Sequence, residues 1–232
     1  GNVGADPQKR KKGERKVVEH YKIIYEGGEG ELVEKKSRFI AQIAPVKTEE
    51  EALAFVEEIR RQHWNARHHC YAYIIGERGQ TARCSDDGEP SQTAGKPMMD
   101  VLEGEELHDV CAVVTRYFGG TLLGTGGLVR AYSGALKEGL KNCVAVEKRL
   151  GVQMEAEADY NHVGKLQYIA AQEGIDILES RYTDRAVFVF LVPVSMEERF
   201  RTKITEGTNG RAQIRRIKEL YYGMAEGELV VF

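Results

Sequence analysis

The stretch that decides the fold runs Val110-Cys-Ala-Val-Val-Thr115, then Arg116-Tyr-Phe-Gly-Gly-Thr-Leu-Leu-Gly-Thr-Gly-Gly127, then Leu128-Val-Arg-Ala-Tyr-Ser-Gly-Ala-Leu136. The first segment is a continuous apolar run, which is typical of a buried strand. The last segment has the spacing of a helix, and the middle one carries five glycines in nine positions. The sequence therefore predicts a strand, a glycine-rich loop and a helix in succession.

The glycine-rich loop suggests an anion site. Glycine allows positive φ and a close approach to main-chain N–H groups, and a helix start supplies unpaired donors with a partial positive charge. Such a loop suits phosphate, and flanking arginines could pair with phosphate oxygens. The alternative is a tight turn and close helix packing, since neither the P-loop nor the dinucleotide pattern is met. The candidate phosphate-binding residues are Arg116, Gly119, Gly120, Gly124, Gly126, Gly127 and Arg130.

A second candidate site is the acidic turn that holds Asp86, Asp87 and Glu89. Three carboxylates within four residues could hold Mg²⁺ together with a phosphate, or supply a general base. Asp-Gly and Glu-Pro are also ordinary turn chemistry, so a solvated acidic turn is the alternative.

Lys96 follows in the segment Thr93-Ala-Gly-Lys-Pro97, beside a glycine turn where a helix should begin. It could pair with the same phosphate, or be a surface cation. Each of these segments ends a strand or starts a helix. The sequence therefore allows the acidic turn and the segment with Thr93 and Lys96 to converge with the glycine-rich loop, and leaves open whether they do.

His68 and Cys70 lie on the same face of a predicted strand over residues 69–75. They could form a base and nucleophile pair. Residues two apart on a strand seldom hydrogen-bond, so we favour Cys70 as a core residue and His68 as a pocket wall. A zinc site formed by His63, His68, His69 and Cys84 lacks a recognised ligand spacing.

Composition and charge predict a reduced, cytoplasmic, soluble protein. The four cysteines are scattered without a C-x-x-C pair, and no apolar run is long enough to span a bilayer. Residues 1–16 hold six basic and two acidic residues, so the rest of the chain carries a net charge of −7. We expect this segment to be a disordered basic tail, its initial glycine being a residue left by cloning. The acidic remainder argues against a large nucleic-acid groove.

The first half, residues 17–147, is predicted to be an α+β domain. Strands are expected over 21–25, 39–46, 69–75 and 109–118, in the order ββαβαβα with all helices on one face of the sheet. Thr48-Glu-Glu-Glu51 should cap the first helix, and Pro97 suits the first turn of the second.

The second half, residues 148–232, shows a new pattern. Strand spacing over 152–158 precedes helical spacing from Val163 to Ala170, two strands over 175–182 and 186–194, a helix with Met196, Phe200 and Ile204, and a last strand over 213–222. The order is βαββαβ, the split ferredoxin-like arrangement. It lacks catalytic motifs, which favours a packing or recognition module.

Three blocks together resemble the YigZ/IMPACT family over about residues 20 to 145. They are His68-His-Cys70-Tyr-Ala72, then Ser85-Asp-Asp-Gly-Glu-Pro90 with Thr93-Ala-Gly-Lys-Pro97, and Arg116-Tyr-Phe-Gly-Gly120 with Gly126-Gly-Leu-Val-Arg-Ala-Tyr132. One departure is Gln92, where the family tends to have glycine; a side chain there would crowd a ligand that approached the backbone.

The resemblance implies a first domain similar to the second domain of small-subunit ribosomal protein five, as in domain IV of elongation factor G, followed by a ferredoxin-like domain. It also implies a translation-associated binding or regulatory module that recognises RNA phosphate or a translation-machinery partner such as the ribosome. The alternative is an enzyme or binder of a phosphorylated metabolite or nucleotide. We expect a binding protein rather than an enzyme, with no cofactor unless Mg²⁺ joins the acidic turn; the oligomeric state is left open.

Overall fold

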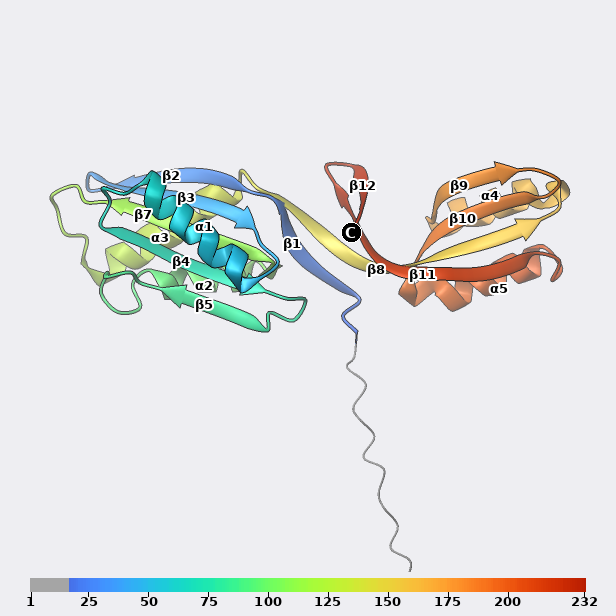
Figure 1. Cartoon of the computed structure of the whole chain (residues 1–232), viewed down its shortest axis with the longest axis horizontal. Coiled ribbons are helices and arrows are strands. Elements are labelled where there is room, and N and C mark those ends of the chain that lie inside the picture. Colours follow the sequence, from blue (N-terminus) through green and yellow to red (C-terminus); the bar gives the residue numbers. More distant parts are fainter. Residues whose placement is uncertain (1–16) are drawn as a thin grey trace, which may run out of the picture.

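The computed structural model of the protein describes residues 17–232, which form two lobes joined by long strands (Figure 1). The basic tail expected over residues 1–16 lies outside the described residues. Within residues 17–232, no helix is both long and apolar enough to cross a membrane.

The first lobe is a five-stranded antiparallel sheet with helices packed on it. Its strands are, from one edge to the other, β2 (Gly28–Glu34), β3 (Ser37–Pro45), β7 (Val110–Tyr117), β4 (His68–Ile75) and β5 (Thr81–Ser85). Its helices are α1 (Glu49–Gln62), α2 (Gly95–Gly104) and α3 (Gly124–Leu140).

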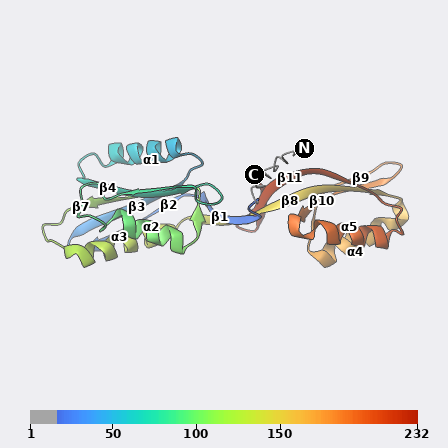
Figure 2. The same cartoon turned by 90° about the horizontal axis from the view of Figure 1, so that it is seen from below.

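Helices cover both faces of this sheet, so the prediction that all of them lie on one face was wrong. Helix α1 packs on one face, and α2 and α3 pack on the other (Figure 2). The reason lies in β7: Cys111 and Val113 join the core under α1, while Ala112 and Val114 join the core under α2 and α3. A strand buried on both sides is apolar throughout rather than alternating, which the run from Val110 to Thr115 already indicates.

The start of α3 differs from the sequence prediction. The helix begins at Gly124 and not after Gly127, so the glycine-rich segment is divided between a short loop and the first helical turn. Gly120 and Gly124 have φ of +89° and +71°, values that glycine adopts without strain. The remaining predicted strands and helices of this lobe are present. Thr48 caps α1 as expected, with its Oγ1 accepting from the Glu51 N–H at 3.2 Å.

The second lobe has the predicted element order. It consists of β8 (Val144–Ala158), the short 3₁₀ turn Tyr160–His162, α4 (Val163–Glu173), β9 (Asp176–Tyr182), β10 (Ala186–Pro193), a second 3₁₀ turn Val194–Met196, α5 (Glu197–Gly207), β11 (Gln213–Ala225) and β12 (Glu228–Val231). Its strands lie in the order β9-β10-β8-β11, all antiparallel, with α4 and α5 on one face (Figure 2). The hairpin of β11 and β12 extends beyond the predicted last strand.

One long strand, β8, runs through both lobes. Its first residues pair with β1 (His20–Glu26), which also pairs with the short β6 (Leu107–His108), and its later residues pair with β10. The predicted boundary between residues 147 and 148 falls inside this strand. Beside it, the Lys148 ammonium lies 4.6 Å from the ring centre of Phe232 and just over 5 Å from those of Tyr21 and Tyr221. These cation–π contacts tie the two terminal segments to the shared strand.

The contact between β2 and α3 provides a test of the packing. A Cβ on Gly30 would lie 2.5 Å from the backbone nitrogen of Gly139. Because the atom it meets belongs to the main chain, a methyl group at Gly30 would fit only if the backbone of β2 or α3 moved. We predict that Gly30→Ala lowers the free energy of unfolding by about 2 to 3 kcal/mol in urea denaturation. The matched change Gly164→Ala, in open space on α4, should instead raise it by about 0.5 kcal/mol. Equal effects of the two substitutions would contradict this packing.

Candidate functional site

A cavity of about 530 Å³ opens at the end of the first lobe, where β4 and β7 meet the start of α3. Its walls are apolar and come from Pro90, Phe118, Leu122, Leu123 and Leu128. Its polar lining consists of Arg67, His68, Glu89, Arg116, Gly124 and Thr125. Apolar walls with a few convergent polar groups are the usual form of a ligand site.

The floor of the cavity is a buried ion pair. The guanidinium of Arg116 donates to Glu89 Oε1 at 2.7 Å, and the hydroxyl of Tyr132 donates to the same oxygen at 2.8 Å. A second guanidinium nitrogen of Arg116 donates to Ser37 Oγ at 3.4 Å. Burial raises the pKa of Tyr132 well above its usual range, so the phenol stays protonated and remains a donor. Two desolvated charges are stable here because each is met by the other and by further hydrogen bonds.

Arg116 is therefore not the mobile cation that the sequence predicts. Its side chain is buried and lies between two rings, 5.5 Å from the ring centre of Phe39 and 5.6 Å from that of Phe118. The sequence could not show this, because the partner Glu89 is 27 positions away.

The first turn of α3 and Arg130 do come together as predicted. No side chain caps the helix, and Gly124 and Thr125 line the cavity. The guanidinium of Arg130 lies against the first turn, 3.3 Å from the place that a Cβ on Gly126 would occupy. Gly127 lies in the same turn.

The loop that leads into α3 is fixed by Gly119. Its N–H donates to Ser37 Oγ at 3.1 Å, and a Cβ would lie 2.1 Å from the carbonyl carbon of Lys36. Gly119 is therefore needed for close packing of the loop against the turn between β2 and β3. Close packing is the role that the sequence analysis gave as the alternative to anion binding.

The three carboxylates of the acidic turn point to different partners. Asp86 accepts from the N–H groups of Gln92, Ala94 and Gly95 at 2.8 to 3.1 Å, and so caps the start of α2. Asp87 accepts from the His69 N–H at 2.8 Å. Glu89 faces the cavity, and residues 17–232 contain no group of three or more His, Cys, Asp or Glu side chains placed to hold a metal ion. Asp86 and Asp87 therefore hold the turn and the start of α2 through backbone N–H groups.

Gln92, Thr93 and Lys96 lie away from the cavity. Thr93 donates to the Pro90 carbonyl at 2.6 Å, and Lys96 pairs with Asp100 one turn along α2. Gln92 has a φ of +62°, a value that strains a residue with a side chain. A glycine at this position would therefore relieve backbone strain rather than make room for a ligand. Lys96 and Thr93 therefore do not converge with the glycine-rich loop: both lie at the start of α2, and of the acidic turn only Glu89 lines the cavity.

His68 and Cys70 do not pair with each other. The thiol of Cys70 donates to the Asp86 carbonyl at 3.1 Å, and burial raises its pKa far above the usual value, so no thiolate forms. His68 Nδ1 lies 2.9 Å from the Asp87 carbonyl oxygen, and its Nε2 lies 3.8 Å from Glu89 Oε1. The alternative of a core cysteine and a histidine in the pocket wall fits this geometry.

Sequence reasoning missed several residues of the site. Tyr132 and Ser37 are buried partners of the ion pair, and nothing in their spacing distinguishes them from ordinary core residues. Phe118 and Leu122 are 52% and 81% exposed, and their apolar character within a loop was the signal that could have found them.

Comparison with known proteins assigns both halves of the chain. The sequence profile of the Impact N-terminal domain matches residues 35–140, and that of a domain of unknown function, DUF1949, matches residues 157–211. The chain is 43% identical to the IMPACT family member YvyE of Bacillus subtilis (strain 168) over 199 residues, which are 86% of this chain and 92% of that protein. It is 37% identical to the IMPACT family member YigZ of Escherichia coli (strain K12) over 187 residues, which are 80% and 92% of the two chains.

A solved structure has the same overall fold. It is a crystal structure described as that of a hypothetical protein, with a TM-score of 0.56 and 34% sequence identity. The match covers 87% of this chain and 99% of the other. The two-domain α+β architecture is thus shared along nearly the whole length.

The buried ion pair predicts an unequal response to two identical substitutions. Glu89→Gln leaves Arg116 buried without a countercharge, so we expect the free energy of unfolding to fall by about 3 kcal/mol. Glu31→Gln removes a carboxylate that pairs with Arg38 at 2.7 Å on the surface, and should cost less than about 1 kcal/mol. Urea denaturation followed by circular dichroism measures both. Equal losses would show that the Glu89 pair does not stabilise the fold.

Proposed function

The chain belongs to the IMPACT family, and from this premise we propose that it is a translation-associated binding module that recognises RNA phosphate at the tip of its first lobe. The tip means the turn at residues 35–36, the α1–β4 connection at 63–67, the loop at 118–123 and the first turn of α3. One observation carries the proposal: the uncapped start of α3 opens beside exposed cations that have no carboxylate partner among residues 17–232.

The helix supplies fixed donors for an anion. Helix α3 is 17 residues long and no side chain hydrogen-bonds its first N–H groups. The N-terminus of such a helix carries a partial positive charge and favours phosphate. Glycines in the first turn leave these donors open to a ligand.

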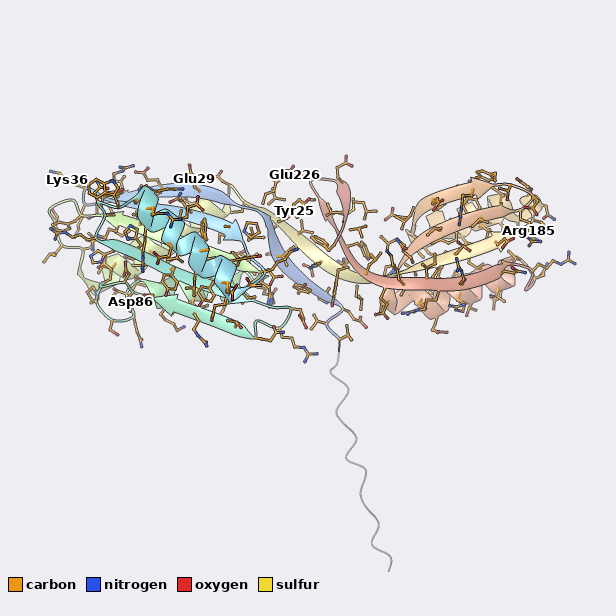
Figure 3. The ribbon with its side chains drawn as sticks, viewed as in Figure 1. Tyr25, Glu29, Lys36, Asp86, Arg185 and Glu226 are labelled. Carbon is orange, nitrogen blue, oxygen red and sulfur yellow. The ribbon has the colours of Figure 1, made fainter. Side chains whose placement is uncertain are left out.

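Four side chains supply mobile charge around that helix start. Arg67 lines the cavity and Arg130 lies against the first turn of α3. Lys35 and Lys36 form the two-residue turn between β2 and β3, with φ of 45° and 64°, and Lys36 projects at the end of the lobe (Figure 3). Positive φ at both positions normally selects asparagine or glycine, so two lysines here place charge at the tip at some cost in backbone strain.

Exposed apolar side chains at the same end suit nucleotide bases. Trp64 is 80% exposed in the connection between α1 and β4, and Phe118 and Leu122 border the cavity. Aromatic faces next to cations are typical of sites that bind single-stranded nucleic acid.

The fold gives further support by analogy. We assign the second lobe to the ferredoxin-like fold, an assignment that is supported by the strand order β9-β10-β8-β11 with two helices on one face. For the first lobe we retain the likeness to ribosomal protein five and to domain IV of elongation factor G. Ribosomal protein five and elongation factor G both act on the ribosome, and by this analogy we place the chain in the cytoplasm.

A phosphorylated metabolite or nucleotide is the second candidate ligand. The cavity volume of about 530 Å³ lies in the range of small-molecule sites, and the same helix start would hold its phosphate. Such a ligand would bind with weak salt dependence, because it displaces few counterions, whereas RNA binding should fall steeply with salt.

The proposal predicts an effect of Arg130→Ala on RNA affinity. The probe is a fluorescein-labelled single-stranded RNA of about twelve nucleotides, titrated with full-length protein from about 50 to about 200 mM salt. The variant should bind about three- to tenfold more weakly at low salt, and its slope of log K against log salt should become shallower by about one.

Arg211→Ala is the matched control, because Arg211 is exposed in the second lobe and likewise has no carboxylate partner within residues 17–232. It should leave affinity and slope unchanged. RNA affinity that does not change with salt, or an equal loss in both variants, would overturn the tip as the phosphate site. Sedimentation with ribosomes in the absence of RNA affinity would point to a protein partner instead.

A further inference from the structure

The floor of the cavity presents a carboxylate oxygen that the fold leaves unused. Glu89 is only 8% exposed, and both of its hydrogen bonds, from Arg116 and from Tyr132, go to Oε1. No side-chain or backbone donor within residues 17–232 hydrogen-bonds to Oε2. An ionised carboxylate can only accept, so this oxygen calls for an N–H or O–H donor from a ligand in the cavity.

His68 supplies a second acceptor beside it. Its Nδ1 lies 2.9 Å from the Asp87 carbonyl oxygen. A carbonyl oxygen can only accept, so Nδ1 carries the proton, and Nε2 of the neutral ring is an acceptor. That Nε2 lies 3.8 Å from Oε1 of the same carboxylate, and both side chains line the cavity, so the cavity holds a histidine acceptor and a carboxylate acceptor from neighbouring residues.

The walls define the body of the ligand. Pro90, Phe118, Leu122 and Leu128 enclose the space above the two acceptors with apolar surface. At the rim stand the exposed guanidinium of Arg67 and the start of α3. The cavity thus fits a flat, largely apolar ring with two adjacent donors on one edge and a phosphate nearby.

We propose that the cavity binds an unpaired guanine base of RNA, an inference that rests on the proposed function. The Watson–Crick edge of guanine carries two neighbouring donors, N1–H and the N2 amino group, which match Glu89 Oε2 and His68 Nε2. Adenine and cytosine each offer an amino group next to an acceptor, and uracil offers one N–H between two acceptors. O6 of guanine faces Arg67, and its phosphate lies on the first turn of α3. Reading the edge of an everted base between apolar side chains is a common mode of RNA recognition.

The test uses four labelled heptamers that differ at the central base: UUUGUUU, UUUIUUU with inosine, UUUAUUU and UUUUUUU. Hypoxanthine, the base of inosine, lacks only the N2 amino group. At fixed salt the full-length protein should bind the guanine heptamer about tenfold more tightly than the uracil heptamer, with inosine intermediate and adenine close to uracil. Fluorescence anisotropy measures all four.

A variant locates the preference without breaking the buried ion pair. In His68→Ala the affinity for the guanine heptamer should fall to about that for the inosine heptamer, because the acceptor of the N2 amino group is lost while Glu89 Oε2 remains. His20→Ala, which removes an exposed histidine paired with Glu147 at the junction of the lobes, should keep the ratio of the parent protein. Circular dichroism and melting temperature confirm that both variants fold.

The outcomes separate the two proposals. Salt-dependent binding with equal affinity for all four heptamers would overturn the guanine pocket and leave the phosphate site standing. Binding of none of them would overturn both. A guanine preference that is equal for inosine and persists in His68→Ala would overturn the assignment of the two acceptors.

Discussion

The buried ion pair between Glu89 and Arg116 is the interaction on which the tip of the first lobe depends. It joins the acidic turn to the end of β7, and through Tyr132 it reaches the core-facing side of α3. Through Ser37, which accepts from both Arg116 and the Gly119 N–H, it reaches the turn between β2 and β3. Because a desolvated charge without its partner is costly, this pair holds four segments in one arrangement.

This constraint decides which groups are available to a ligand. Arg116 is buried in its ion pair, so the cations of the tip that are available to a ligand are those without a carboxylate partner among residues 17–232, such as Arg67 and Arg130. Glu89 accepts from Arg116 and Tyr132 at Oε1 alone, and its side chain also lines the cavity. The same carboxylate can therefore stabilise the structure and present a fixed acceptor, which is how a rigid site is preorganised at little entropic cost.

The periodicity of apolar residues predicted most helices and strands of the fold. It failed for elements that form only because of packing against residues far away in the sequence. The apolar spacing of α1 and the alternation of β4 were read correctly. Strand β2 has two glycines and three glutamates, so it has no strand signal, and it exists because its backbone packs against α3 at Gly139. For the site, the glycine-rich segment indicated the loop before α3, although the helix begins inside that segment, at Gly124. Neither the burial of Arg116 nor the separate role of Asp86 can be read from local sequence, because both follow from partners brought close by the fold.

The overall acidity of the chain does not conflict with a phosphate site, because charge is arranged differently in the two lobes. In the second lobe many arginines are held by carboxylates, as in the contacts of Arg181 with Glu155, Arg185 with Glu157 and Arg216 with Glu197. At the tip the cations stand without such partners and surround a helix start that is itself positive. Because salt screens charges beyond about 8 to 10 Å, an incoming phosphate responds to this local arrangement and not to the net charge of the protein. Strand β8 runs without a break from the junction of the lobes into the second lobe. The tip therefore lies at the opposite end of the molecule from the arginine–glutamate ion pairs of the second lobe (Figure 1).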